Sequence, residues 1–175
     1  ADINTPQTSP TGNIHGMPVS VLLGKGPEEL TSIGYDGQKL RPSRLVQIGL
    51  RDLDHEEKLR LRESEIHTYT MSDIDRRGMA TVVMEAIAIA TKDVDFLHVS
   101  FDIDVLDPSV APGTGTAKKG GLTYREAHLA LEMVAETGLL RSFELVEVNP
   151  VLDRENMTAQ VAVGLIASAM GKRIL

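Results

Sequence analysis

The chain alternates short apolar runs with amphipathic segments, and this alternation constrains its fold more than any other feature. Two segments, residues 77–92 and 157–170, carry apolar side chains at helical spacing. Four apolar runs are expected to form strands, three of them buried, at residues 45–50, 67–70, 96–101 and 143–148. Strands separated by helices indicate an α/β fold with a mostly parallel sheet flanked by helices.

Local signals also predict where one helix begins and ends. Thr123 and Glu126 have the spacing of a capping box, in which the two side chains satisfy free N–H groups at a helix start. Gly138 then supplies a stop signal. The 175 residues contain no repeat or linker, so they suit one domain.

Carboxylates follow three of the predicted strands. Asp52 and Asp54 come after the first strand, Asp102 and Asp104 after the strand at 96–101, and Glu147 near the end of the last. In parallel α/β sheets, ligands bind beyond the carboxyl ends of the strands. The sequence therefore predicts a site on that side of the sheet.

The pair Asp102 and Asp104 is the sharpest chemical signal. Two adjacent carboxylates repel each other unless a cation neutralises them, and oxygen ligands suit Mg²⁺ or Mn²⁺. The alternative is a surface turn or helix cap near Asp107. An EF-hand loop is excluded because its sixth and twelfth positions are Asp107 and Gly113 instead of Gly and Glu.

A second enzyme hypothesis comes from the same segment. An apolar strand followed by Asp-x-Asp also resembles the haloacid-dehalogenase phosphatases. Those enzymes need a later lysine and a further acidic motif, and Lys172 and Asp153 are poorly placed for these roles.

Composition excludes several other classes of function. The net charge of −7 argues against a nucleic-acid partner, and the absence of cysteine excludes thiolate catalysis and disulfides. No apolar run is long enough for a membrane span. The chain opens at Ala1 without an initiator methionine or a signal-like stretch, so we expect an interior part of a longer cytoplasmic protein.

His15 lies in a loop that concentrates short polar side chains. Ser9, Thr11 and Asn13 precede it, and loops of this composition often carry binding sites. His98 and His128 fall within a predicted strand and a predicted helix, where structural roles are expected.

Several of these segments together resemble the arginase family of the ureohydrolase superfamily, in the order in which they occur there. The matching segments are residues 2–5, 12–18, 100–104, 106–108, 113–116, 120–126 and 147–150. The resemblance implies a three-layer arginase-like α/β fold and two Mn²⁺ ions per active site. It also implies hydrolysis of the L-arginine guanidino group to L-ornithine and urea by a metal-bridging hydroxide.

The family pattern assigns roles to individual residues. Asp102 corresponds to a residue that bridges the two metals, while Asp104 and Asp2 bind one metal each, and Asp2 also assists proton transfer. His15 corresponds to the proton-shuttling residue, and Glu147 to the carboxylate that orients the guanidinium group.

The resemblance also implies an amino-acid end of the site. The α-carboxylate of the substrate is expected to contact the loop, with Asp54 as the partner of its α-ammonium group and Asp52 as a supporting carboxylate. The other substrate-binding positions are Asn4, Ser9, Thr11, Gly12 and Asn13 at this end, and Thr116 near the guanidinium end.

The chain lacks part of the family pattern. It begins inside the Asp-x-His-x-Asp metal motif, so residues 1–175 are expected to form the C-terminal part of one arginase-like domain with three of six metal ligands. The isolated chain should then be inactive. Val105 is more typical of agmatinases, which leaves an agmatinase or guanidinobutyrase, or an inactive subunit, as alternatives. The family implies a homo-oligomer, a trimer or a hexamer.

Overall fold

The computed structural model describes all residues, 1–175. The first 45 residues form loops and short helical turns and contain no strand. These elements are η1 (Ile14–Gly16), α1 (Pro18–Leu22), α2 (Glu28–Thr31) and η2 (Pro42–Arg44). The sequence analysis assigned no regular structure to this region.

Two pairs of parallel strands follow. The first pair is β1 (Val46–Leu50) and β2 (His67–Thr70), connected by α3 (His55–Glu63). The second pair is β3 (Leu97–Asp102) and β4 (Leu140–Val146). No strand joins one pair to the other, so the parallel strands form two separate two-stranded sheets. The predicted α/β class and the parallel direction are confirmed.

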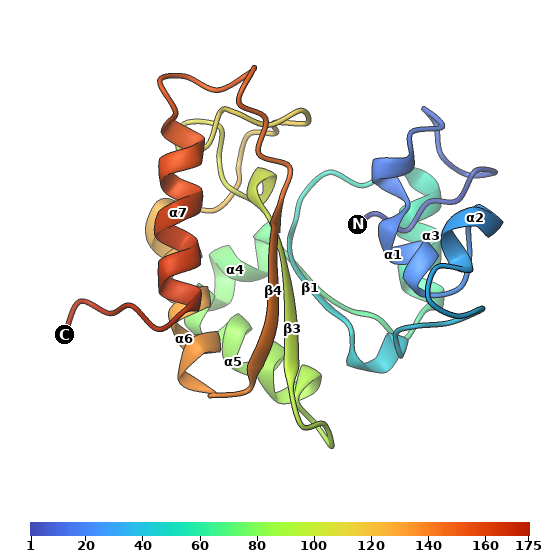
Figure 1. The fold of residues 1–175 in the computed structure, drawn as a ribbon, viewed down its shortest axis with the longest axis horizontal. Coiled ribbons are helices and arrows are strands. Elements are labelled where there is room, and N and C mark those ends of the chain that lie inside the picture. Colours follow the sequence, from blue (N-terminus) through green and yellow to red (C-terminus); the bar gives the residue numbers. More distant parts are fainter.

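The remaining α-helices follow β2 in the chain. They are α4 (Met71–Arg77), α5 (Met79–Ala90), α6 (Tyr124–Glu136) and α7 (Met157–Ala169). Figure 1 shows α5, α6 and α7 on one side of the β3–β4 pair and α1, α2 and α3 grouped beyond the other side. No helix in the structure combines the length and apolar character needed to cross a membrane.

Two predicted boundaries were wrong. The segment 77–92 is not one helix, because Gly78 adopts a φ of 79° and separates α4 from α5. Such a conformation is accessible to glycine and ends a helix locally. The last strand begins at Leu140 and ends at Val146, since Glu147 takes a φ of 66° and leaves the extended conformation.

The expectation that the strands are buried was also wrong. Along β3, Val99 and Phe101 face the helices, while His98 and Ser100 are exposed. Polar side chains of β4 continue this exposed surface, where His98 Nδ1 lies 2.7 Å from Ser142 Oγ. Helices within the chain cover only one face of the pair, so the strands show the alternation of a half-covered sheet.

The hydrophobic core lies between the sheets and helices α4 to α7. Val82 of α5, Leu131 of α6 and Leu165 of α7 are almost completely buried and belong to one cluster with Phe101 of β3. The predicted capping box at the start of α6 is confirmed, because the Thr123 side chain accepts from the Glu126 N–H and the Glu126 carboxylate accepts from Thr123 N. This packing holds the carboxyl end of β3 in place.

Candidate active site

The Asp102–Asp104 pair lies at the carboxyl end of β3. Asp102 is the last residue of the strand, and Asp104 lies in η3 (Ile103–Val105) directly after it. The Asp104 N–H donates a hydrogen bond of 2.9 Å to Asp102 Oδ1. Ile103 between them is completely buried, so its packing orients both neighbours. Asp102 therefore caps this short turn while it contributes to the site.

Four carboxylates from distant parts of the chain influence one another here. The pKa of Asp102 is raised to about 7, mainly by burial. The nearby carboxylates of Asp104, Asp2 and Glu147 contribute to the rise, and a backbone hydrogen bond from Asp104 opposes it. Burial also raises the pKa of Asp2, with contributions from Glu57 and Asp104. Such a concentration of negative charge favours a divalent cation.

The possible metal ligands are of the kind that a hard cation prefers, but there are too few of them to complete a site. Carboxylate oxygens are ligands that Mg²⁺ and Mn²⁺ accept. However, the structure contains no group of three or more His, Cys, Asp and Glu side chains placed to hold a metal ion. Asp2, Asp102 and Asp104 can therefore supply part of a metal shell, which needs further ligands to be complete.

Two of the predicted site residues have an unusual backbone. Asp2 has a φ of 54° and Glu147 a φ of 66°, in the left-handed region that non-glycine residues rarely adopt. The other non-glycine residues with positive φ are Asp93, Glu155 and Asn156. Strained conformations of this kind persist where the surroundings enforce them and are frequent at functional sites.

Thr116 contacts the carboxylate pair directly. Its hydroxyl donates a hydrogen bond of 2.7 Å to Asp104 Oδ2. The resemblance placed Thr116 near the guanidinium end of the substrate, and the structure adds that it orients a predicted metal ligand. Groups that hydrogen-bond a metal ligand fix its orientation and basicity.

Asn4 and Asp54 meet at the other end of the site. Asn4 Nδ2 donates to Asp54 Oδ2 at 2.6 Å, and Asn4 Oδ1 accepts from Thr8 Oγ1 at 2.8 Å. Asn4 is buried, so its amide holds Asp54 and the loop in position. Burial alone would raise the pKa of Asp54, but hydrogen bonds from Glu57 N–H and Asn4 hold it below its usual value. Asp54 therefore stays a carboxylate.

Hydrogen bonds between its own side chains and its backbone shape the polar loop at residues 9–13. Ser9 Oγ accepts from the Gly12 N–H at 2.9 Å, and Thr11 Oγ1 accepts from the Asn13 N–H at 3.2 Å. Thr11, Gly12 and Asn13 are exposed, as is His15 on η1. His15 is close enough to Asp2 for its charge to lower the pKa of that carboxyl.

Asp52 lies at the rim. It forms an ion pair with Lys118, whose Nζ is 2.7 Å from Asp52 Oδ2, and both side chains are more than half exposed. The hydrogen bond from Lys118 lowers the pKa of Asp52. Lys118 follows the Thr116 loop, so the pair connects the end of β1 with that loop.

The sequence analysis missed Glu57. Its carboxylate is buried and accepts a hydrogen bond from Asp54 N at 3.3 Å through Oε2. With Asp54 it forms a capping box at the start of α3. The Asp-x-x-Glu spacing is the same signal that was used at Thr123, and it could have identified this residue.

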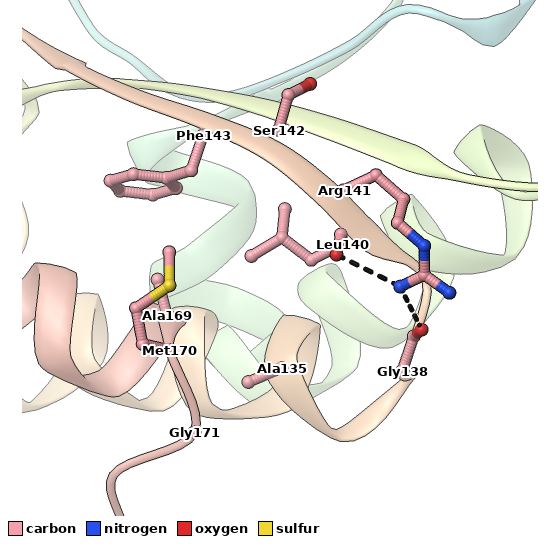
Figure 2. Close-up of a pocket in the computed structure, with 9 residues that line it drawn as sticks. All are labelled: Ala135, Gly138, Leu140, Arg141, Ser142, Phe143, Ala169, Met170 and Gly171. Carbon is pink, nitrogen blue, oxygen red and sulfur yellow. Dashed lines mark hydrogen bonds between the residues drawn. The ribbon is translucent and has the colours of Figure 1, made fainter.

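One cavity of the structure lies away from this site. A shallow cavity of about 300 Å³ lies at the amino end of β4, between that strand and α7, with Leu140, Phe143 and Met170 among its lining residues (Figure 2). It contains none of the predicted site residues. The carboxylates lie at the opposite, carboxyl end of the strands, where the sequence predicts the site.

The chain is similar to proteins of one known family. The arginase family matches residues 1–171. The arginase of Bacillus caldovelox is 52% identical over 174 residues, which cover 99% of this chain and 58% of that protein. Its native crystal structure superimposes with a TM-score of 0.97 at 51% identity, covering 100% of this chain and 58% of the other.

A more distant relative has the same fold. The Entamoeba histolytica arginase, whose structure was solved in complex with L-ornithine, has a TM-score of 0.89 at 34% identity, over 98% of this chain and 57% of that one. The chain thus spans somewhat more than half the length of the relatives it matches. On the family match and on this structural likeness, the chain belongs to the arginase family.

Proposed function

We propose that the protein to which this chain contributes hydrolyses the guanidino group of L-arginine to L-ornithine and urea, with two Mn²⁺ ions in its active site. The observation that carries the proposal is the environment of Asp102, where Asp104, Asp2 and Glu147 bring like charges together beside the carboxyl end of β3. Membership of the arginase family, and the L-ornithine bound by the Entamoeba histolytica relative, give the substrate class.

The chain's own residues divide the work. Asp2, Asp102 and Asp104 would bind the cations, and ligands from outside the chain would complete the metal site. Thr116 keeps Asp104 oriented. When bound, the two cations supply a water-derived nucleophile at neutral pH. Glu147 orients the planar guanidinium group through its carboxylate. His15, exposed and near Asp2, carries a proton between the site and solvent.

The amino-acid end selects the substrate. Asp54 is held as a carboxylate and suits the α-ammonium group of an amino acid. Thr11 and Asn13 are exposed on the loop, within a turn that their own hydrogen bond shapes, and can meet the α-carboxylate. Asn4 is committed to Asp54 and Thr8, so we assign it to holding this end in place.

The test compares two substrates that differ only at this end. Urea release is measured from L-arginine and from agmatine, which lacks the carboxylate, with a protein of the relatives' length that contains this chain. Arginine should be preferred by at least about 10-fold, the value of one charge-assisted hydrogen bond. Faster hydrolysis of agmatine would reassign the substrate and keep the chemistry, and no urea from either would point to an inactive subunit.

A further arm concerns the 175 residues alone. With only three of the six expected metal ligands, they should bind Mn²⁺ weakly and release no urea. Both two-stranded sheets have unpaired edges, so the isolated chain should also tend to aggregate. Mn²⁺ titration and a urea assay of the purified chain test this, and robust turnover would contradict the ligand assignment. We also propose a trimer or hexamer in the cytoplasm for the longer protein, which light scattering after size exclusion would check for its oligomeric part.

A further inference from the structure

Arg51 links three segments that surround the candidate site. It follows β1 directly, and its Nη2 donates to the backbone carbonyls of Asp104 at 2.6 Å and Lys118 at 2.8 Å, with a longer contact of 3.5 Å to that of Leu106. The first carbonyl belongs to a predicted metal ligand. The second carbonyl, that of Lys118, lies two residues after Thr116, whose hydroxyl donates to the Asp104 carboxylate.

Two glycines allow these segments to approach one another. Gly49 of β1 has a φ of 90°, and a Cβ at this position would collide with the Val105 side chain of η3. A Cβ at Gly121 would lie 2.5 Å from the carbonyl carbon of Leu106. The end of β1, η3 and the loop before Gly121 therefore meet at one junction, and Arg51 lies within it.

The junction does not need Arg51 to join its two loops. Leu122 N–H donates to Val105 O at 2.9 Å, Asp107 N–H donates to Leu122 O at 3.0 Å, and Gly120 N–H donates to the Asp107 carboxylate at 2.8 Å. What Arg51 adds is a connection from both loops to β1 and to the Asp52–Asp54 segment that follows. Its Nε is buried without a hydrogen-bond partner, which opposes folding and argues against a purely stabilising role.

We propose that Arg51 is a positioning residue of the active site, which sets the carboxylate of Asp104 and the hydroxyl of Thr116 relative to the substrate-binding end at Asp54. It acts through backbone carbonyls and touches neither substrate nor metal. The guanidinium group is needed because the two N–H groups of Nη2 point in fixed directions in its plane, one toward each loop, whereas the N–H groups of a lysine ammonium rotate on a flexible stem. The catalytic part of the inference rests on the proposed function, whereas the geometric part does not.

The test is Arg51→Lys in a protein of the relatives' length that contains this chain. Amide hydrogen exchange should rise about 10-fold or more at residues 104–106 and 116–120 and stay unchanged in α5 and α6. Mn²⁺ affinity and kcat should each fall on the order of 10–100-fold, the usual effect of changing groups behind metal ligands. KM for L-arginine should change less than about 3-fold, because the contacts to substrate remain.

Arg141→Lys is the matched control. Arg141 is another arginine whose terminal nitrogen donates to two backbone carbonyls, those of Gly138 at 2.8 Å and Leu140 at 3.3 Å, at the opposite end of β4 (Figure 2). The same substitution there should alter neither exchange in the site loops, nor Mn²⁺ affinity, nor kcat.

Each outcome decides the matter. Unchanged exchange at residues 104–106 and 116–120 with unchanged Mn²⁺ affinity would overturn the proposal. So would exchange that rises throughout the molecule, or a variant that does not fold, because both would make Arg51 a general stabilising residue. If the unsubstituted protein releases no urea, the proposed function fails, and the exchange and Mn²⁺ measurements still test the positioning role.

Discussion

Residues 1–45 contribute none of the 16 buried residues of the hydrophobic core cluster, whereas residues 69–169 contribute all of them. The first region is held by hydrogen bonds between its own turns, for example Ser20 Oγ to Ile3 O at 2.5 Å and Val19 N to Asp2 O at 3.0 Å. The second is held by packing of helices against β3 and β4. The candidate site draws on both regions.

The two regions carry different parts of the candidate site. Asp102 and Asp104 stand on the packed region, where Ile103 is completely buried, so their positions are rigid. Ser9, Thr11, Asn13 and His15 stand on the exposed loop, where local hydrogen bonds shape short turns. A metal shell requires fixed geometry, while substrate entry and proton exchange require solvent access. The arrangement suggests that substitutions in the packed region disturb metal binding and those in the loop disturb turnover or affinity.

The largest effect is expected from Asp102→Ala in a protein of the relatives' length. Loss of the carboxylate that we propose to bridge the two cations should reduce metal content. It should also raise the activation free energy by several kcal/mol, which lowers turnover roughly 10³-fold or more. Metal analysis of the purified variant and a urea assay test this. Two metals bound at full occupancy would remove Asp102 from the ligand set and break the assignment of metal binding to the packed region.

His15→Ala should show the opposite signature. A general acid–base group contributes on the order of 10²–10⁴-fold to turnover. Because His15 is exposed, the free energy of unfolding should change by no more than about 0.5 kcal/mol. Turnover and denaturant melts measure both quantities, with metal content expected to remain normal. Turnover equal to that of the unsubstituted protein would return His15 to a structural role.

Asp54→Ala tests the link between the regions. Removing the carboxylate that we propose as the partner of the α-ammonium group should raise KM for L-arginine roughly 10–100-fold, since hydrogen bonds to charged groups contribute about 1.5–3 kcal/mol. Asp54 also caps α3, so about 1 kcal/mol of stability should be lost.

Thr123→Ala is the matched control, because Thr123 is the capping-box residue of α6 and does not belong to the candidate site. It should lose a similar amount of stability and leave KM unchanged. Equal KM values for the two variants would mean that Asp54 acts only as a cap.

The smallest effect concerns His128 in the packed region. Burial lowers the pKa of His128, whose Nδ1 lies 2.8 Å from Ser168 Oγ of α7. The folded state therefore takes up a proton less readily than the unfolded chain. Stability from this residue is complete above the unfolded pKa of about 6.5 and declines as pH falls below it, by at most about 1.4 kcal/mol per pH unit.

Urea melts between pH 8 and about pH 5 measure this slope. The loss of unfolding free energy per pH unit should be smaller in His128→Gln. It should be unchanged in His67→Gln, because His67 is exposed on β2. If the dependence of stability on pH is the same in His128→Gln, protonation of this α6 histidine does not affect the stability of the packed region.

Much of the fold could be predicted from the sequence because its signals are local. The strand at residues 67–70 and the capping box at Thr123 were confirmed, since alternation and cap spacing act within a few residues. The same rule applied at Asp54 would have identified α3 and Glu57. The break at Gly78 was missed because the residues on both sides follow a helical pattern.

The sequence by itself determined which residues can do chemistry: carboxylates after strands, a polar loop with a histidine, and no cysteine. Only the tertiary structure decided which of them meet. The Asn4–Asp54 hydrogen bond joins residues 50 positions apart, and Arg51 reaches carbonyls 53 and 67 positions away. Such contacts depend on the path of the whole chain through its packed sheets and helices, because loop closure over this distance is unfavourable until that packing forms.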